Sequence, residues 1–316
     1  MSNWDSARKE AVRRRYEDAL ESFVTRVKQD RYIVAAILFG SLAYDEVWEK
    51  SDIDMVLIVR DDKAANRLYA LVENGINIHA DMVTRNQFKA RVEGNLQGAW
   101  THSVMARSTL LFSTDDTLQA YYENVRHVGS RDREMQMLRA TASVIPLLTK
   151  AEKWLVVKND PTYSFLYVML LVYQLSEVEV LWHADVPGRE VIQQALVYNP
   201  DFFTPLYTDL AHRPKDAETM RWAIQQVHNY IEERQNVLFK PILSYLSEAG
   251  GVRSSSEIEE YLRKRQGGGL SLACEWLADK GIIQKVATPL RLTEKSRFTL
   301  DESAYYYDGD NIDDAN

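Results

Sequence analysis

Two continuous apolar runs near the start of the chain restrict its fold more strongly than any other sequence feature. The runs are residues 33–39 and 53–59, and both are rich in β-branched and large apolar side chains. Runs of this length predict strands that are buried on both faces of a sheet. The preceding segment, residues 6–30, has apolar side chains at intervals of three and four, which is typical of an amphipathic helix.

The chain up to residue 116 completes a sheet module. Residues 62–74 are interpreted as a helix, and residues 76–82 alternate apolar and polar side chains as a half-buried strand does. The order helix, strand, strand, helix, strand predicts an α/β or α+β sheet module.

The strand pattern stops after this module, and helical periodicity dominates the middle of the chain. Long segments with apolar residues at helical spacing are separated by turn residues such as Asn159 and Pro187. This region predicts an all-helical bundle. The predicted helices are residues 118–127, 132–158, 162–184, 189–198 and 216–248.

The C-terminal region predicts a small winged helix. Two helices are expected at residues 254–265 and 270–280, followed by short strands around a turn at Pro289. Residues 301–316 hold six acidic residues and no Lys or Arg, and their far end is expected to be a mobile tail. The predicted domains are residues 1–116, 117–249 and 250–316.

Composition and charge restrict the class of protein. The 316 residues include 38 Lys and Arg against 46 Asp and Glu, which gives a net charge of −8. A protein whose main task is to coat nucleic acid needs an excess of basic residues, so this charge argues against that class. A single cysteine, Cys274, cannot form an internal disulfide, and the longest nearly apolar run is too short to span a membrane. We therefore expect a cytoplasmic protein without a membrane segment.

A short motif between the two apolar runs carries the chemistry. Gly40 and Ser41 are followed, ten residues later, by Asp52 and Asp54. Because the two acids are two positions apart at the start of a strand, their carboxylates lie on one face. Convergent carboxylates suit Mg²⁺, which completes its shell with water and substrate phosphates. Gly40 lets backbone amides approach a phosphate, and Ser41 adds a hydroxyl donor, so the motif predicts phosphoryl or nucleotidyl transfer.

The segment FGSLAYDEVWEKSDIDMVLIV resembles the signature of the DNA polymerase β-like nucleotidyltransferase superfamily. In that signature Gly-Ser or Gly-Gly precedes Asp-hydrophobic-Asp-hydrophobic by about ten residues. The resemblance implies an α+β fold with a nucleotidyltransferase-type mixed sheet and flanking helices, followed here by the all-helical bundle and the small winged helix. It implies that Asp52 and Asp54 bind metal ions, with two Mg²⁺ ions expected. It also implies that Gly40 and Ser41 hold the β and γ phosphates of ATP or another nucleoside triphosphate.

Members of this superfamily present a third carboxylate from a later strand, and Asp81 is the candidate. Asp81 follows the alternating strand pattern, and as the third acid it would bind metal or act as a base toward the incoming hydroxyl. The alternative is an exposed polar residue on an edge strand. His79 is interpreted as a neighbour of Asp81 on the same solvated face.

The helical middle region is similar to the substrate-side bundle of the aminoglycoside nucleotidyltransferase branch. There the bundle supplies an acidic residue that accepts the substrate proton, and Glu177 is the candidate base here; the alternative is a solvated helix end. The resemblance implies Mg²⁺-dependent transfer of a nucleoside monophosphate, AMP from ATP, to a hydroxyl of a small, aminoglycoside-like acceptor, with release of pyrophosphate.

Two other functions remain open. One is an AMPylating enzyme that modifies a protein, and the other is a nucleotide-sensing regulator whose winged helix binds DNA. Residues 249–300 hold nine basic and six acidic residues, a net of +3, but the second predicted helix of this region is largely apolar. Few of its side chains could read base edges, so packing or formation of a homodimer is favoured over specific DNA contact.

Overall fold

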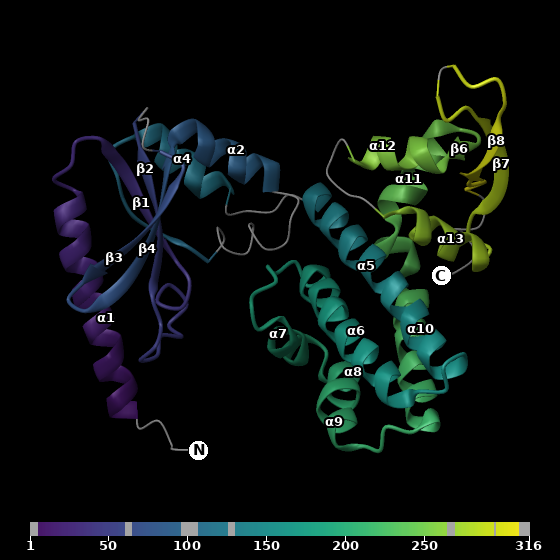
Figure 1. Ribbon diagram of the computed structural model, residues 1–316, viewed down its shortest axis with the longest axis horizontal. Coiled ribbons are helices and arrows are strands. Elements are labelled where there is room, and N and C mark those ends of the chain that lie inside the picture. The colour runs from purple at the N-terminus through teal and green to yellow at the C-terminus, as the bar shows by residue number, and fades with distance from the viewer. Residues whose placement is uncertain are drawn as a thin grey trace. The chain divides into compact units, whose positions relative to one another are not determined.

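The structure of the chain is a computed structural model, which describes residues 6–60, 65–95, 107–125, 130–263, 269–293 and 295–309. The chain divides into two compact units, Met1–Gly129 and Ser130–Asn316. Figure 1 shows a sheet flanked by helices in the first unit and mostly helices in the second. The predicted division into three domains stays a prediction.

The first unit is built on a five-stranded mixed sheet. Its strand order is β3-β4-β2-β1-β5, in which β2 and β4 are parallel and the other neighbours are antiparallel. The two apolar runs form β1 and β2 as predicted, which confirms the α+β fold class. The strand bounds are β1 Ile33–Phe39, β2 Ile53–Val59, β3 Arg67–Glu73, β4 Ile76–Thr84 and β5 Thr109–Ser113.

Helices cover both faces of this sheet (Figure 1). On one face, Tyr16 of α1 packs in a core with Met55 of β2. On the other face, Phe88 of α2 and Leu118 of α4 pack with Ile58 of β2. Because side chains alternate along a strand, this division places the even-numbered residues of β2, including Asp54, on the face of α2 and α4. The helix bounds are α1 Ser6–Val27, α2 Arg85–Asn95 and α4 Asp116–Val125.

The helix predicted for residues 62–74 is wrong. Residues 67–73 form strand β3, which pairs with β4 in a hairpin; residues 61–64 lie outside the described part of the chain. Asn74 and Gly75 connect the two strands with φ values of 49° and 75°. Positive φ at two successive residues is the geometry of the tight turn that joins twisted antiparallel strands. Strand β5 and helix α2 were not predicted.

The second unit begins with a group of helices. The predicted helices 132–158 and 162–184 correspond to α5 and α6, and α5 continues through Pro146 without a break. The predicted helix 216–248 is two helices, α10 and α11, which meet at Phe239 just before Pro241. The bounds are α5 Ser130–Val156, α6 Pro161–Trp182, α7 Val191–Tyr198, α8 Pro200–Phe203, the π-helix η1 Thr204–Asp209, α9 Leu210–His212, α10 Ala217–Leu238 and α11 Lys240–Ala249.

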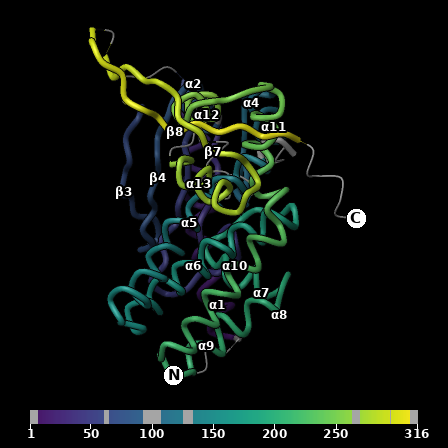
Figure 2. The backbone as a smooth tube through the Cα atoms, turned by 90° about the vertical axis from the view of Figure 1, so that its right-hand side faces the viewer, coloured from purple at the N-terminus to yellow at the C-terminus, as the bar shows by residue number. Residues whose placement is uncertain are grey.

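Two helices and a three-stranded sheet follow in the same unit. Figure 2 traces this part of the chain and labels α12, α13, β7 and β8. The sheet has the order β6-β8-β7, and side chains such as Leu277 and Tyr305 join one apolar core with the helices α5 to α11. Only the far end of the acidic segment 301–316 was expected to be a tail, and its first residues, 301–306, pair with β7 as part of strand β8. Residues 310–316 lie outside the described part of the chain. The assignment to the winged-helix class stays a prediction. The bounds are β6 Arg253–Ser254, α12 Ser255–Arg263, α13 Ser271–Asp279, β7 Gln284–Leu290 and β8 Leu300–Tyr306.

Helix α6 is long and apolar enough to cross a membrane, and among the described residues it is the one helix that meets this test. Of the most apolar 18-residue stretch of this helix, 56% is buried inside the protein. A core helix of a soluble protein has the same properties, so α6 is weak evidence for a membrane segment.

Candidate functional site

Polar side chains gather at one end of the parallel pair formed by β2 and β4. Asp52 directly precedes β2 and Asp54 is its second residue, and the register pairs Asp54 with His79 of β4. Residues paired across neighbouring strands point to the same face of a sheet. The sheet therefore places two carboxylates and one imidazole side by side on the face of α2 and α4.

The distances within this group are short. His79 Nδ1 lies 2.9 Å from Asp52 Oδ2 and 3.6 Å from Asp54 Oδ1. One ligand atom from each of the three residues lies within 4.8 Å of the others. The side chains of His79 and Asp52 are each 41% exposed and that of Asp54 is 20% exposed, so an ion could enter from solvent. Two carboxylates and a ring nitrogen at this spacing can hold a divalent metal ion.

Gly40 fits closely against this group. It follows β1, whose last residue, Phe39, pairs with Asp54, and its φ of +80° lies in the left-handed region. An added Cβ at Gly40 would lie 2.6 Å from Asp54 Oδ2, so any other residue would displace the carboxylate. Ser41 is half-buried in the turn that follows, where its carbonyl oxygen accepts a hydrogen bond of 2.8 Å from the Glu46 amide. The glycine turn and the two acids thus lie at the same edge of the sheet.

The structure does not bring Asp81 into this group. Asp81 pairs in register with Val56, one strand repeat beyond Asp54. Its carboxylate forms an ion pair with Arg91 of α2, and Arg91 also donates a hydrogen bond of 2.7 Å to Asn66 Oδ1. This ion pair connects α2 to β4. The role of Asp81 as third acid stays a prediction, and the contact with Arg91 argues against it.

Glu177, the predicted base, lies in the second unit on α6. It is half-buried, and burial raises the pKa of its carboxyl group. Its neighbour on the same helix, Glu179, is almost fully buried and accepts hydrogen bonds of 2.7 Å from the Tyr230 hydroxyl and 3.2 Å from Asn199 Nδ2. Glu179 therefore has structural partners, whereas the raised pKa of Glu177 suits a group that accepts a proton.

His79 was not predicted from the sequence to be a member of the metal site. The alternating pattern of residues 76–82 put His79 and Asp81 on one face, which the structure bears out. The pairing of Asp54 with His79 depends on the parallel register of β2 and β4, and no local pattern reports that register. A signal was available in the residue type, because an imidazole is a common metal ligand.

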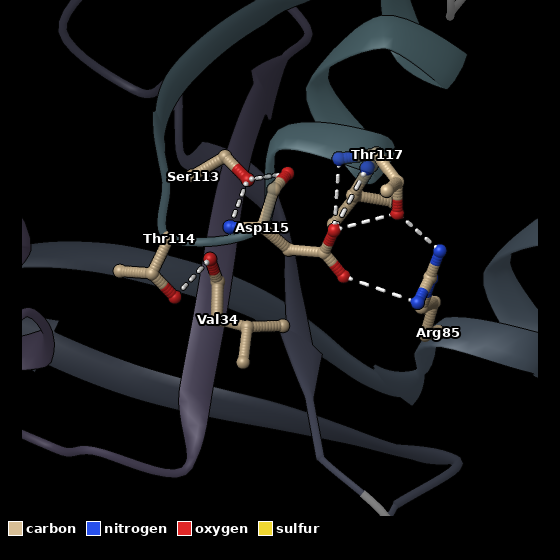
Figure 3. A network of polar contacts seen from close by, with 7 residues as sticks. Val34, Arg85, Ser113, Thr114, Asp115 and Thr117 are labelled. Atoms are coloured by element: carbon tan, nitrogen blue, oxygen red, sulfur yellow. Dashed lines mark hydrogen bonds and ion pairs between the residues drawn. The ribbon is translucent and has the colours of Figure 1, made fainter.

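A second polar group lies at the opposite ends of β1 and β2 (Figure 3). Asp115 caps α4, since its carboxylate accepts hydrogen bonds from the Thr117 amide at 2.9 Å and the Thr117 hydroxyl at 2.7 Å. Arg85 Nη1 lies 3.2 Å from Asp115 Oδ2. The Thr117 hydrogen bond is the main cause of the lowered pKa of Asp115. This network holds the starts of α2 and α4 together beside an open cavity of about 620 Å³ and takes no part in the site at Gly40.

A mixed sheet with a glycine turn at the end of one strand and paired carboxylates at the start of the next defines the nucleotidyltransferase class of fold. The predicted enzyme class is confirmed by the comparison with known families. Residues 21–117 match the family described as Polymerase beta, Nucleotidyltransferase, and this part of the chain is a nucleotidyltransferase domain of the polymerase β type. The match includes the candidate site.

A solved structure with a related fold covers both units. The crystal structure of a nucleotidyltransferase-like protein from Exiguobacterium sibiricum 255-15 matches with a TM-score of 0.62 over 92% of this chain and 99% of that chain. The sequence identity is 14%, so the likeness shows a shared fold. No curated protein matches the chain in sequence.

Proposed function

We propose that the protein transfers a nucleoside monophosphate, AMP from ATP, to a hydroxyl of a small acceptor and releases pyrophosphate with the help of Mg²⁺. The observation that carries this proposal is the contact between Gly40 and Asp54. It brings the turn that would receive phosphates to the carboxylates that would receive metal ions. The matched nucleotidyltransferase domain at residues 21–117 supports the same reaction class.

The residues of this chain would share the work as follows. Asp52 and Asp54 would hold the divalent ions, which would supply positive charge to neutralise the phosphates. The backbone after Gly40 and the hydroxyl of Ser41 orient the β and γ phosphates. A bond forms between the acceptor oxygen and the α phosphorus while the bond from that phosphorus to the bridging oxygen of pyrophosphate breaks. The acceptor hydroxyl loses its proton, and Glu177 is the proposed base.

The test measures pyrophosphate release from labelled ATP, CTP, GTP or UTP with Mg²⁺ and a panel of hydroxyl acceptors. Asp52→Asn and Asp54→Asn should each reduce the rate by at least about a hundredfold, because each removes a charged metal ligand without changing size. Asp45→Asn is the matched control, since it removes one exposed carboxylate from the same loop. Release that survives both active-site substitutions would refute the proposal.

The acceptor class follows from where the label appears. Label on a small hydroxyl compound supports the proposed reaction, whereas label on a protein in the mixture supports an AMPylating enzyme. Retention of labelled nucleotide without pyrophosphate release, together with a salt-dependent shift on duplex DNA, would support a nucleotide-sensing regulator. We also propose a cytoplasmic location, which the single buried thiol of Cys274 supports.

A further inference from the structure

Asp52, Asp54 and His79 form the candidate metal site, and its third side chain is an imidazole where the sequence predicted a carboxylate. His79 belongs to the group by two independent observations, its register with Asp54 and the position of its Nδ1 atom. That atom faces both acids, at 2.9 Å from Asp52 Oδ2 and 3.6 Å from Asp54 Oδ1. Neighbouring ligand atoms around a six-coordinate ion are about 3 Å apart when the bonds are about 2.1 Å long. The three side chains therefore have the spacing of ligands to one ion.

The competing carboxylate is engaged elsewhere. Asp81 lies two residues further along β4, which is about 6.6 Å along a strand. Its ion pair with Arg91 supplies the charge that a metal ion would otherwise supply. Releasing Asp81 would break the ion pair that connects α2 to β4. The geometry thus favours His79 over Asp81 as the third protein ligand.

The ligand type determines which metal ion binds best. Mg²⁺ prefers oxygen ligands and keeps several of its waters, whereas imidazole nitrogen suits divalent transition ions. Mn²⁺ is the member of that series whose preference for oxygen ligands is nearest to that of Mg²⁺, so it is the one that also suits the two carboxylates. Building on the proposed function, we infer that His79 is the third protein ligand of the catalytic metal site and that the site prefers a transition ion of the Mn²⁺ type over Mg²⁺. The remaining positions of the ion stay open to water and substrate phosphate, since all three side chains are partly exposed.

The test uses Mn²⁺ alone with the untagged full chain. Pulsed electron paramagnetic resonance of the bound Mn²⁺ should show coupling to an imidazole nitrogen, and a titration should show Mn²⁺ binding at least about tenfold more tightly than Mg²⁺. His79→Ala should abolish the nitrogen coupling and weaken Mn²⁺ binding by about tenfold or more. His79→Asp should also abolish the coupling while restoring a third oxygen ligand, so the ratio of Mn²⁺ to Mg²⁺ affinity should fall.

A matched control and two opposing outcomes complete the experiment. His212→Ala removes an exposed histidine at the end of α9 and should leave the coupling and both affinities unchanged. Mn²⁺ binding that requires Asp52 and Asp54 but shows no nitrogen coupling, or coupling that survives in His79→Ala, would overturn the inference and leave the proposed function intact. Failure of Mn²⁺ and Mg²⁺ to bind at all would contradict the inference and the proposed function together.

Discussion

Gly40 and Asp54 are in such close contact that a side chain on the glycine would collide with the carboxylate. An added Cβ would lie 2.6 Å from Asp54 Oδ2 and 3.3 Å from Asp54 Cβ. The backbone at Gly40 also has a φ of +80°, which residues with a side chain adopt at a cost. The pairing of Phe39 with Asp54 across β1 and β2 fixes this contact. The glycine therefore has two separate roles, one in the turn and one in leaving space for a metal ligand.

Gly40→Ala should weaken divalent metal binding more than it weakens the fold. The new methyl group pushes the Asp54 carboxylate away from Asp52 and His79, so we expect metal affinity to fall by about tenfold or more. The left-handed backbone should cost about 1 kcal/mol of the free energy of unfolding. Calorimetric titration with Mn²⁺ or Mg²⁺ measures the first effect, and urea unfolding measures the second.

Gly75→Ala separates these two effects. Gly75, in the turn between β3 and β4, has a φ of +75°, and an added Cβ there would meet nothing within 4 Å. Its substitution should cost a similar free energy of unfolding and leave metal affinity unchanged. Equal losses of metal affinity in the two variants would mean that backbone strain, and not the contact with Asp54, explains the result at Gly40.

The ion pair between Asp81 and Arg91 should contribute to stability and not to metal binding. Asp81→Asn, Arg91→Gln and the double variant form a cycle in which the coupling energy should be about 0.5 kcal/mol, because both side chains are partly exposed. Metal affinity in Asp81→Asn should change by less than about threefold, because His79 occupies the third position. A loss comparable to that of Asp54→Asn would identify Asp81 as a ligand.

The strands that carry the candidate site could be predicted because their signal is local. Continuous apolar runs gave β1 and β2 with their observed bounds, and the spacing of Gly40, Asp52 and Asp54 placed phosphate and metal groups at one sheet edge. The prediction for residues 67–73 was wrong because Arg, Leu, Ala and Glu at these positions suit a helix, whereas the turn at Asn74 and Gly75 forces a hairpin. Turn chemistry outweighed helix propensity there.

The position of His79 could not be predicted, for a different physical reason. Whether His79 or Asp81 lies beside Asp54 depends on the parallel register of two strands that β3 separates along the chain. A shift of that register by two residues would keep every side chain on its face and exchange the two candidates. Alternation within one strand carries no information on that choice.

Cys274 should be unreactive in the folded protein. It is almost fully buried in the core of the second unit, and burial raises the pKa of its thiol to about 12, so almost no thiolate exists near neutral pH. Alkylation by iodoacetamide should be negligible without denaturant and should rise with urea in step with unfolding followed by circular dichroism. Glutathione in the same solution controls for the reagent, and rapid labelling of the native protein would contradict the buried position.

Ionisation of Glu177 should lower the free energy of unfolding as pH rises. Burial raises the pKa of its carboxyl group, so the folded chain holds this proton more tightly than the unfolded chain does. As pH rises from the ordinary glutamate range through the raised pKa, the unfolded state releases the proton first, and the free energy of unfolding falls. Glu177→Gln removes this ionisation, so the variant should gain stability relative to the original protein as pH increases.

Urea unfolding at about pH 4 and about pH 8 measures that gain, and Glu248→Gln, at an exposed position on α11, controls for removing a negative charge. The same variant tests the proposed base, because loss of a proton acceptor should reduce the rate of nucleotidyl transfer by about a hundredfold or more. If the variant is more stable at high pH and fully active, burial does raise the pKa of Glu177, but Glu177 is not the base. One that is less stable at high pH would show that the ionised carboxylate has favourable partners, so desolvation would not be the dominant effect on its pKa.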